Sequence, residues 1–128
     1  EEVGTLICVE VGPEVIAGSS RLKAGTAQKM VLNMLSTGSM IKIGKTYENF
    51  MIDLKATNEK LKDRAVRIVS QIAEVDNNIA NETLAKCDWK IKTAIVALKN
   101  NVEFDKANEE LKKNHGVLRR VLGEKSKV

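Results

Sequence analysis

The side chains best suited to chemistry lie in residues 12–29, which read GPEVIAGSSRLKAGTAQK. Within this stretch two adjacent hydroxyls, Ser19 and Ser20, precede the cations of Arg21 and Lys23. A guanidinium can form paired charge-assisted hydrogen bonds with phosphate or carboxylate oxygens, and an ammonium adds a point charge. These residue types predict an anion site that suits a phosphate ester. On spacing alone, a solvated connecting turn is the simpler interpretation, because Gly and Ser are common in turns.

Other groups that could do chemistry are better explained by structural roles. Glu14 could be mistaken for a catalytic base, but we expect its carboxylate to accept backbone N–H groups of the turn. His115 stands near a predicted helix C-terminus, where a partly charged imidazole is favourable. Trp89 is expected to pack in the core. Cys8 and Cys87 have no CxxC spacing and the chain has one histidine, so we expect two buried thiols and no metal site.

The elements that flank this polar turn (residues 12–25) would position it at the edge of a sheet. Residues 5–11 are β-branched and apolar, the pattern of a strand buried on both faces of a parallel sheet. A lone strand is unstable, so its neighbours must be missing, be supplied by another chain or be replaced by an irregular conformation. After the turn, an apolar stripe predicts a helix that begins near Ala24 or Thr26 and stops at Gly44. A strand end, a turn and a helix N-terminus together predict an anion site.

The rest of the chain predicts a small helical bundle. Residues 47–55 alternate as an extended segment would, and Asn58 then caps an amphipathic helix. Shorter helices are predicted near residues 77–87, 89–100 and 104–113, with a last turn after Gly116. The expected core comprises Ile68, Ile72, Ile79, Leu84, Cys87, Trp89, Ile91, Ala94, Ile95, Leu98, Leu111, Leu118 and Leu122.

Composition argues against two classes of partner. The formal net charge is +4, but basic and acidic residues are interleaved along residues 55–74, as on a solvated helix face. Aromatic residues make up 3% of the chain, which leaves no stacking platform for single-stranded nucleic acid. The apolar run at residues 93–98 is far shorter than the ~20 residues of a membrane span. We therefore expect no nucleic-acid partner and no membrane association.

The order of several motifs resembles one known family. The elements GPE, GSSRLK and GTAQK are followed by VLNMLSTGSMIKIGK, MIDLKATNEKLKDRA, TAIVAL and LRRVLG, so the match covers nearly all 128 residues. This pattern resembles the bacterial N-acetylmuramic acid 6-phosphate etherases, a family shared with the glucokinase regulatory protein. The resemblance implies a mainly α fold, in which a helical bundle similar to a ubiquitin-associated domain follows the last strand and closing helix of a sugar isomerase type α/β domain. The implied boundaries are 1–45 for that remnant, 46–57 for a connector and 58–128 for the helical domain.

The resemblance also implies an activity and a set of ligand contacts. The family cleaves the D-lactyl ether of N-acetylmuramic acid 6-phosphate in cell-wall sugar recycling, with glutamates as acid and base. The chain lacks an initiator Met, so we expect it to begin inside a longer protein, with those glutamates upstream and no catalytic residue here. Ser20 and Arg21 match the ligand-contacting pair of the signature, Lys23 matches its lysine, and Ser19 and Glu14 are weaker candidates.

The remaining expectations are a cytoplasmic homodimer that binds a sugar phosphate and needs neither a cofactor nor a metal. Two alternatives stay open at this point. The first is a non-catalytic regulatory protein that binds a sugar phosphate, since the glucokinase regulatory protein carries the same signature. The second is an interaction module, which rests on fold analogy alone.

Overall fold

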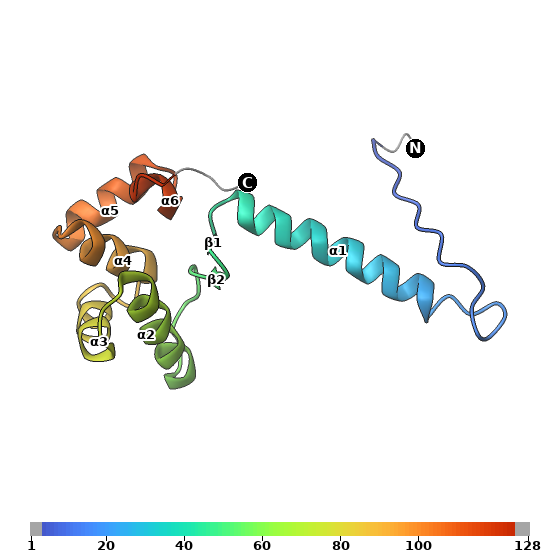
Figure 1. Ribbon diagram of the computed structural model, residues 1–128, viewed down its shortest axis with the longest axis horizontal. Coiled ribbons are helices and arrows are strands. Elements are labelled where there is room, and N and C mark those ends of the chain that lie inside the picture. The colour runs from blue at the N-terminus through green and yellow to red at the C-terminus, as the bar shows by residue number, and fades with distance from the viewer. Residues whose placement is uncertain (1–3, 125–128) are drawn as a thin grey trace. The chain divides into compact units, whose positions relative to one another are not determined.

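The computed structural model, which describes residues 4–124, is mainly α-helical, and this confirms the predicted fold class. Contacts along the chain divide it into two compact units, residues 1–39 and residues 40–128. In chain order the elements are α1 (Lys23–Lys42), β1 (Thr46–Tyr47), β2 (Phe50–Met51), α2 (Glu59–Ala73), α3 (Asn77–Lys86), α4 (Ile91–Asn100), α5 (Phe104–Lys113) and α6 (Leu118–Val121), as Figure 1 shows.

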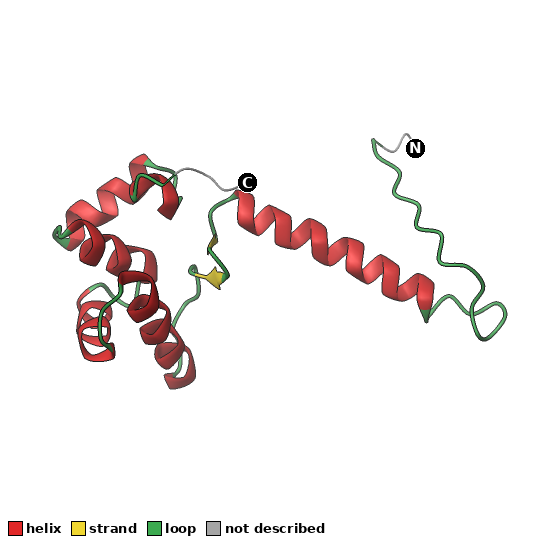
Figure 2. Ribbon diagram, in the orientation of Figure 1, coloured by secondary structure: helices red, strands yellow, loops and turns green. Residues whose placement is uncertain are grey.

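Residues 5–11, expected as the last strand of a sheet, form an irregular segment instead (Figure 2). A strand needs a second strand to pair its backbone N–H and C=O groups, and among residues 4–39 no second strand is present. The side chains are correspondingly open, with Leu6 82% exposed and Ile7 54% exposed. Cys8 is also exposed, so the expectation of two buried thiols was wrong for this residue.

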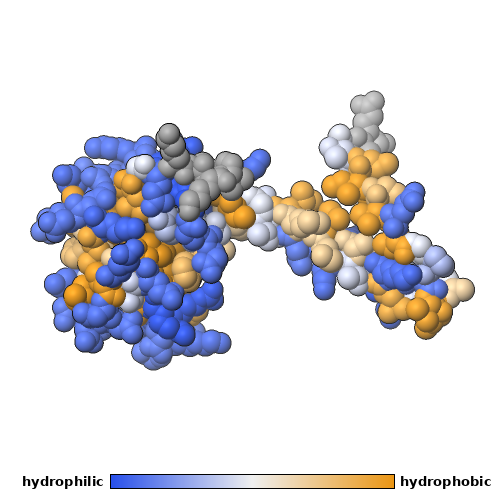
Figure 3. All heavy atoms as spheres, in the orientation of Figure 1, coloured by the Kyte–Doolittle hydropathy of each residue, from blue (hydrophilic) through white to orange (hydrophobic). Residues whose placement is uncertain are grey.

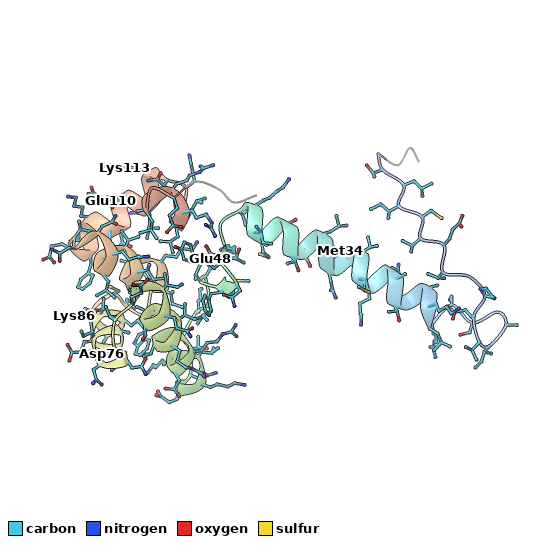
Figure 4. The ribbon with its side chains drawn as sticks, viewed as in Figure 1. Met34, Glu48, Asp76, Lys86, Glu110 and Lys113 are labelled. Atoms are coloured by element: carbon cyan, nitrogen blue, oxygen red, sulfur yellow. The ribbon has the colours of Figure 1, made fainter. Side chains whose placement is uncertain are left out.

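Helix α1 begins at Lys23, one residue before the predicted start, and places Thr26 inside the helix. It runs through Gly38 and ends where Gly44 adopts a φ of +70°, as the glycine predicted. None of its residues is buried. Its apolar side chains therefore face solvent around the helix: Met34 projects away from the ribbon in Figure 4, and hydrophobic residues colour much of α1 in Figure 3.

Helices α2 to α6 form the second unit around α4, which contacts α2, α3, α5 and α6 (Figure 1). Helix α4 is central because its residues between Ile91 and Ala97 are almost all buried. Asn58 caps α2 as predicted, since its Oδ1 accepts from the Leu61 backbone N at 2.9 Å. The predicted stripe of α2 is buried at Ala65, Ile68, Val69 and Ile72.

The core departs from the sequence prediction at a few positions. Ile79 is 44% exposed, because α3 turns Ala80 and Leu84 inward and leaves Ile79 on its outer face. Trp89, Leu98 and Leu122 pack against the core while only partly buried. The other predicted core residues are buried.

The expected connector, residues 46–57, contributes to this core. Strands β1 and β2 pair antiparallel, with Tyr47 opposite Phe50, so the extended segment is a two-stranded hairpin that turns at residues 48–49. The side chains of Tyr47 and Ile52 are 7% and 1% exposed and belong to the same cluster as the helical residues. The hairpin therefore closes the bundle rather than merely leading into it.

Candidate functional site

The polar turn is shaped by two glycines and by one backbone hydrogen bond between residues close in sequence. Gly12 and Gly18 have φ values of +67° and +81°, a backbone region that residues other than glycine rarely adopt. Between them the chain reverses, and the Ser19 backbone N donates to the Ile16 carbonyl at 3.1 Å. The chain then enters α1 through Ser20, Arg21 and Leu22. The sequence predicted this turn from the same glycines.

Glu14 fixes the turn against the N-terminus of α1. Its Oε2 accepts from the Lys23 backbone N at 3.0 Å, and its Oε1 accepts from the Ala24 backbone N at 3.1 Å. The Lys23 Nζ donates back to the Pro13 carbonyl at 2.9 Å. A carboxylate at this end of a helix satisfies unpaired N–H groups and interacts favourably with the helix dipole. The structural role expected for Glu14 is confirmed.

This arrangement corrects one part of the predicted anion site. The sequence suggested that the N-terminal amides of α1 would hold the anion of a ligand, but two of them are already bonded to Glu14. The amide of Gly25 is also used, since it donates to the Ser20 carbonyl at 2.9 Å. A charged ligand at this turn would therefore be bound by side chains and not by the helix N-terminus.

The side chains predicted to contact a ligand differ from one another in exposure and in hydrogen bonding. Ser20 and Arg21 are exposed, and within residues 4–124 the guanidinium of Arg21 forms no hydrogen bond or ion pair. Lys23 is exposed but held at Pro13, and Ser19 is half-buried. Ser20 and Arg21 are thus the two groups that are open to a ligand. Apolar residues lie next to them at the tip of the turn, with Val15 88% exposed.

A second polar cluster, which the sequence did not reveal, holds the hairpin region to the helices. Asp53 forms ion pairs with Lys45 and, at 3.4 Å, with Lys92, whose side chain is only 14% exposed. The Lys92 Nζ also donates to the Gly116 carbonyl at 3.0 Å. Burial by itself would raise the pKa of Asp53, but the hydrogen bond from Lys45 and the two lysine charges outweigh it and lower the pKa. This cluster is satisfied internally and leaves little for a ligand.

A third cluster ties the hairpin to the C-terminal residues. The Tyr47 hydroxyl donates to Glu124 Oε1 at 2.6 Å, and Arg119 pairs with Glu48 at 2.8 Å and with Glu124 at 3.4 Å. Burial, together with the neighbouring carboxylate of Glu124, raises the pKa of Tyr47 to about 12. The phenol is therefore a hydrogen-bond donor at neutral pH and is unsuited to act as a base.

Neither a metal centre nor a catalytic pair is visible in the part of the chain that the structure describes. Across residues 4–124, no three His, Cys, Asp or Glu side chains are grouped so that they could hold a metal ion. The exposed His115 follows α5 with a φ of +55°, and its backbone N donates to the Lys112 carbonyl at 3.1 Å. Trp89 packs against the core, and the Lys62 Nζ lies 5.1 Å from its ring centroid. Of the helices described, none combines the length and hydropathy needed to cross a membrane.

Comparison with known proteins shows which sequences this chain is similar to. Residues 48–92 match the sequence family described as the C-terminal lid domain of glucokinase regulatory protein. An N-acetylmuramic acid 6-phosphate etherase from Pseudoalteromonas atlantica is 50% identical over 118 residues, which cover 92% of this chain and 38% of the relative. Its counterpart from Yersinia pestis is 48% identical over 122 residues, covering 95% of this chain and 41% of the relative. The resemblance to the etherase family is confirmed.

The chain spans about two fifths of the length of the etherases it matches. A match of 118 residues in a chain of 128 must include the polar turn, the hairpin and α2 to α5, wherever it begins. The lid-domain match covers the hairpin turn, α2, α3 and the start of α4. The lid-type sequence therefore lies wholly in the second unit.

Proposed function

We propose that this chain is part of a lyase that cleaves the D-lactyl ether of N-acetylmuramic acid 6-phosphate to give N-acetylglucosamine 6-phosphate. The observation that supports this is the 48–50% identity to named etherases across more than nine tenths of the chain. Such a reaction eliminates lactate, whose ether oxygen gains a proton, and then adds water to the sugar. It would serve the recycling of cell-wall sugars in the cytoplasm.

The acid and base of this reaction are proposed to lie in the remaining three fifths of the parent protein. Elimination needs one group to remove a proton and another to protonate the leaving oxygen, each within hydrogen-bonding reach of its atom. The turn offers Ser20, Arg21 and Lys23, while its carboxylate, Glu14, is bonded to two backbone amides. The isolated 128-residue chain should therefore release no lactate from the substrate. Release above a buffer control would refute this division of the site.

The role proposed for the turn is to hold polar groups of the sugar phosphate. Arg21 and Ser20 would donate hydrogen bonds to it, while Lys23 and Ser19 would contribute charge and a further hydroxyl. In the full-length parent, Arg21→Ala should weaken binding of the sugar phosphate by roughly 1.5–3 kcal/mol, the range for a hydrogen bond to a charged group. Calorimetry measures this directly. Lys29→Ala, which removes an exposed cation further along α1, is the matched control and should leave the affinity unchanged.

If neither Arg21→Ala nor Lys29→Ala weakened binding, Arg21 would be a solvated turn residue and the proposed ligand contact would be wrong. If both weakened binding equally, the effect would be one of overall charge. Only a loss confined to Arg21 supports a direct contact.

The apolar surface of α1 supports the proposed domain boundaries. Leu32 and Met34 are 59% and 62% exposed, although a helix of this composition is normally covered. We propose that residues 1–45 are the end of a sugar isomerase type α/β domain whose other elements cover α1 in the parent protein. Residues 46–57 would join it to the helical domain of residues 58–128 and pack in the core of that domain. Hydrogen exchange of the α1 amides should be much slower in the full-length parent than in the isolated chain.

A non-catalytic regulatory protein that binds a sugar phosphate is the alternative, favoured by the lid-domain match to the glucokinase regulatory protein. Both candidates predict binding of a sugar phosphate, and we propose a homodimer for the parent in either case. Lactate release by the full-length parent separates the two functions, since a regulator would bind without turnover. Sedimentation of the parent tests the dimer.

A further inference from the structure

We propose that the helical unit carries a second ligand site, a cavity that binds a sugar through its phosphate monoester. The cavity has a volume of about 610 Å³ and lies between the tip of the β1–β2 hairpin, α2 and the start of α3. Its polar lining consists of Arg64, Arg67, Gln71, Asn49, Asn77 and Ser70, whose hydroxyl donates to the Val75 carbonyl at 2.6 Å. All of these residues belong to the second unit, so the site is separate from the polar turn of the first.

Helix α2 presents the two arginines on one face. Arg64, Arg67 and Gln71 follow one another at steps of three and four residues, which places their side chains in a row on the helix surface. The Cβ atoms of residues three apart lie about 5–6 Å from each other, close enough for both guanidiniums to reach one anion. Two like charges this close repel each other, and an anion bound between them would reduce that repulsion.

The cavity has positive charge and no carboxylate in its lining. Within residues 4–124, Arg64 forms no ion pair, and the contact found for the Arg67 side chain is a weak one from its Nε to the Asp63 carbonyl at 3.4 Å. Two carboxylates that neighbour the lining in sequence, Glu48 and Asp76, already have partners. Glu48 pairs with Arg119 at 2.8 Å, and Asp76 accepts from the backbone N atoms at the start of α3 (Figure 4).

A second cavity of similar volume, lined mainly by residues 52–57 and 88–93, shows why the cavity beside α2 is selected. That cavity includes Asp53 and Lys92, and there the cation is neutralised by the carboxylate at 3.4 Å and bonded to the Gly116 carbonyl. Lys92, the least exposed cation of that cavity, is thus satisfied by the protein itself, and Lys90 lies 3.9 Å from Asp88, which leaves Lys55 as the one cation of its lining without a carboxylate beside it among the described residues. The arginine pocket has two cations without such a partner.

The lining also fits the rest of a sugar phosphate. Paired guanidiniums match the oxygens of a phosphate, and the amides of Asn49, Asn77 and Gln71 can both donate to and accept from sugar hydroxyls. Phe50 and the buried Ile68 give the cavity an apolar surface for the face of a sugar ring. A volume of about 610 Å³ is within the usual range for small-molecule sites.

Titration of the 128-residue chain, observed by the NMR shifts of its amides, tests this site. The probes are N-acetylglucosamine 6-phosphate, inorganic phosphate and unphosphorylated N-acetylglucosamine. We expect the sugar phosphate to shift the amides of residues 49–50, 64–71 and 77, and to bind at least tenfold more tightly than either of the other two. Arg64→Gln and Arg67→Gln should each weaken it about tenfold or more. Lys106→Gln, which removes an exposed cation of α5 outside the lining of the cavity, should change it less than twofold.

Several results would overturn the proposal. Shifts confined to residues 19–23, or equal binding by the Arg64 and Lys106 variants, would mean that α2 holds no site. Equal binding of the unphosphorylated sugar would mean that the arginines do not recognise phosphate. Equal binding of inorganic phosphate would mean that the amides and Phe50 do not recognise a sugar. None of these outcomes depends on lactate release, so the proposed etherase activity is tested by a separate measurement.

Discussion

Replacing Ile52 with alanine should destabilise the helical unit, although Ile52 lies outside its helices. The side chain is 1% exposed and belongs to the core cluster together with the residues of α2 and α4. The substitution removes three carbons, worth about 0.8 kcal/mol each, and leaves a cavity that the surrounding side chains fill only in part. We therefore expect the free energy of unfolding to fall by about 2.5–4 kcal/mol.

Ile79→Ala is the matched control, because the same chemical change is made at a side chain that is 44% exposed. At Ile79 the substitution removes only about half as much buried apolar surface as at Ile52. Alanine also stabilises the helix by about 0.4 kcal/mol through its higher helix propensity. The expected loss is about 1 kcal/mol. The two variants should therefore differ by at least about 1.5 kcal/mol.

Urea unfolding followed by tryptophan fluorescence measures this difference. Trp89 is the sole tryptophan of the chain and lies in the second unit, so its emission reports on that unit and not on α1. The Ile52 variant should unfold at a clearly lower urea concentration with an unchanged slope. If Ile52→Ala and Ile79→Ala were equally destabilising, the hairpin would be a peripheral connector and its place in the core would be refuted.

Three further predictions concern single groups. At pH 8 a thiol reagent should label the exposed Cys8 and spare Cys87, because burial raises the pKa of Cys87 to about 11; mass spectrometry of the native chain should find one label, and two would contradict the buried thiol. Glu14→Ala should accelerate hydrogen exchange at the amide of Lys23, because a lost cap costs about 0.5–2 kcal/mol, and unchanged exchange would argue against the clamp. The pKa of Asp53 is lowered from its usual 3.8, so its contribution to stability is present above that pH and is lost as the pH falls through its folded value. When the pH falls from 6 to 2.5, the free energy of unfolding should therefore decrease less in the Asp53→Asn variant than in the unaltered chain. Urea unfolding at both pH values measures this, and an equal decrease would contradict the ion pairs.

The features that the sequence predicted well are those that depend on neighbouring residues. The cap at Asn58 and the buried stripe of α2 follow from a short polar residue placed before an apolar repeat. The clamp formed by Glu14 is nearly as local, because a turn of small residues brings it back onto the start of α1. Gly44 ended the predicted helix for the same kind of reason.

The features that sequence reasoning missed depend on which distant segments meet. Residues 5–11 have the composition of a strand, but a strand exists only where a neighbour pairs its backbone, and within the described residues none does. Ile79 has the periodicity of a core residue, but α3 packs through Ala80 and Leu84. The arginine pocket arises because the hairpin tip and the start of α3 come together beside α2, and the spacing of Arg64 and Arg67 alone resembles any solvated helix face.

The sequence by itself therefore determined the resemblance to the etherases, the mainly α content and the turn that carries Ser20 and Arg21. Motif order, helical periodicity and glycine positions are properties of the chain. Only the tertiary structure decided which charged groups already have a partner within the protein. Glu14 occupies the amides at the N-terminus of α1, and Asp53 neutralises the cation of Lys92, whereas Arg64 keeps its charge unpaired within the described residues. The reason is physical: a charge is available to a ligand only when no opposite charge of the protein lies within a few ångströms, and those distances are set by packing.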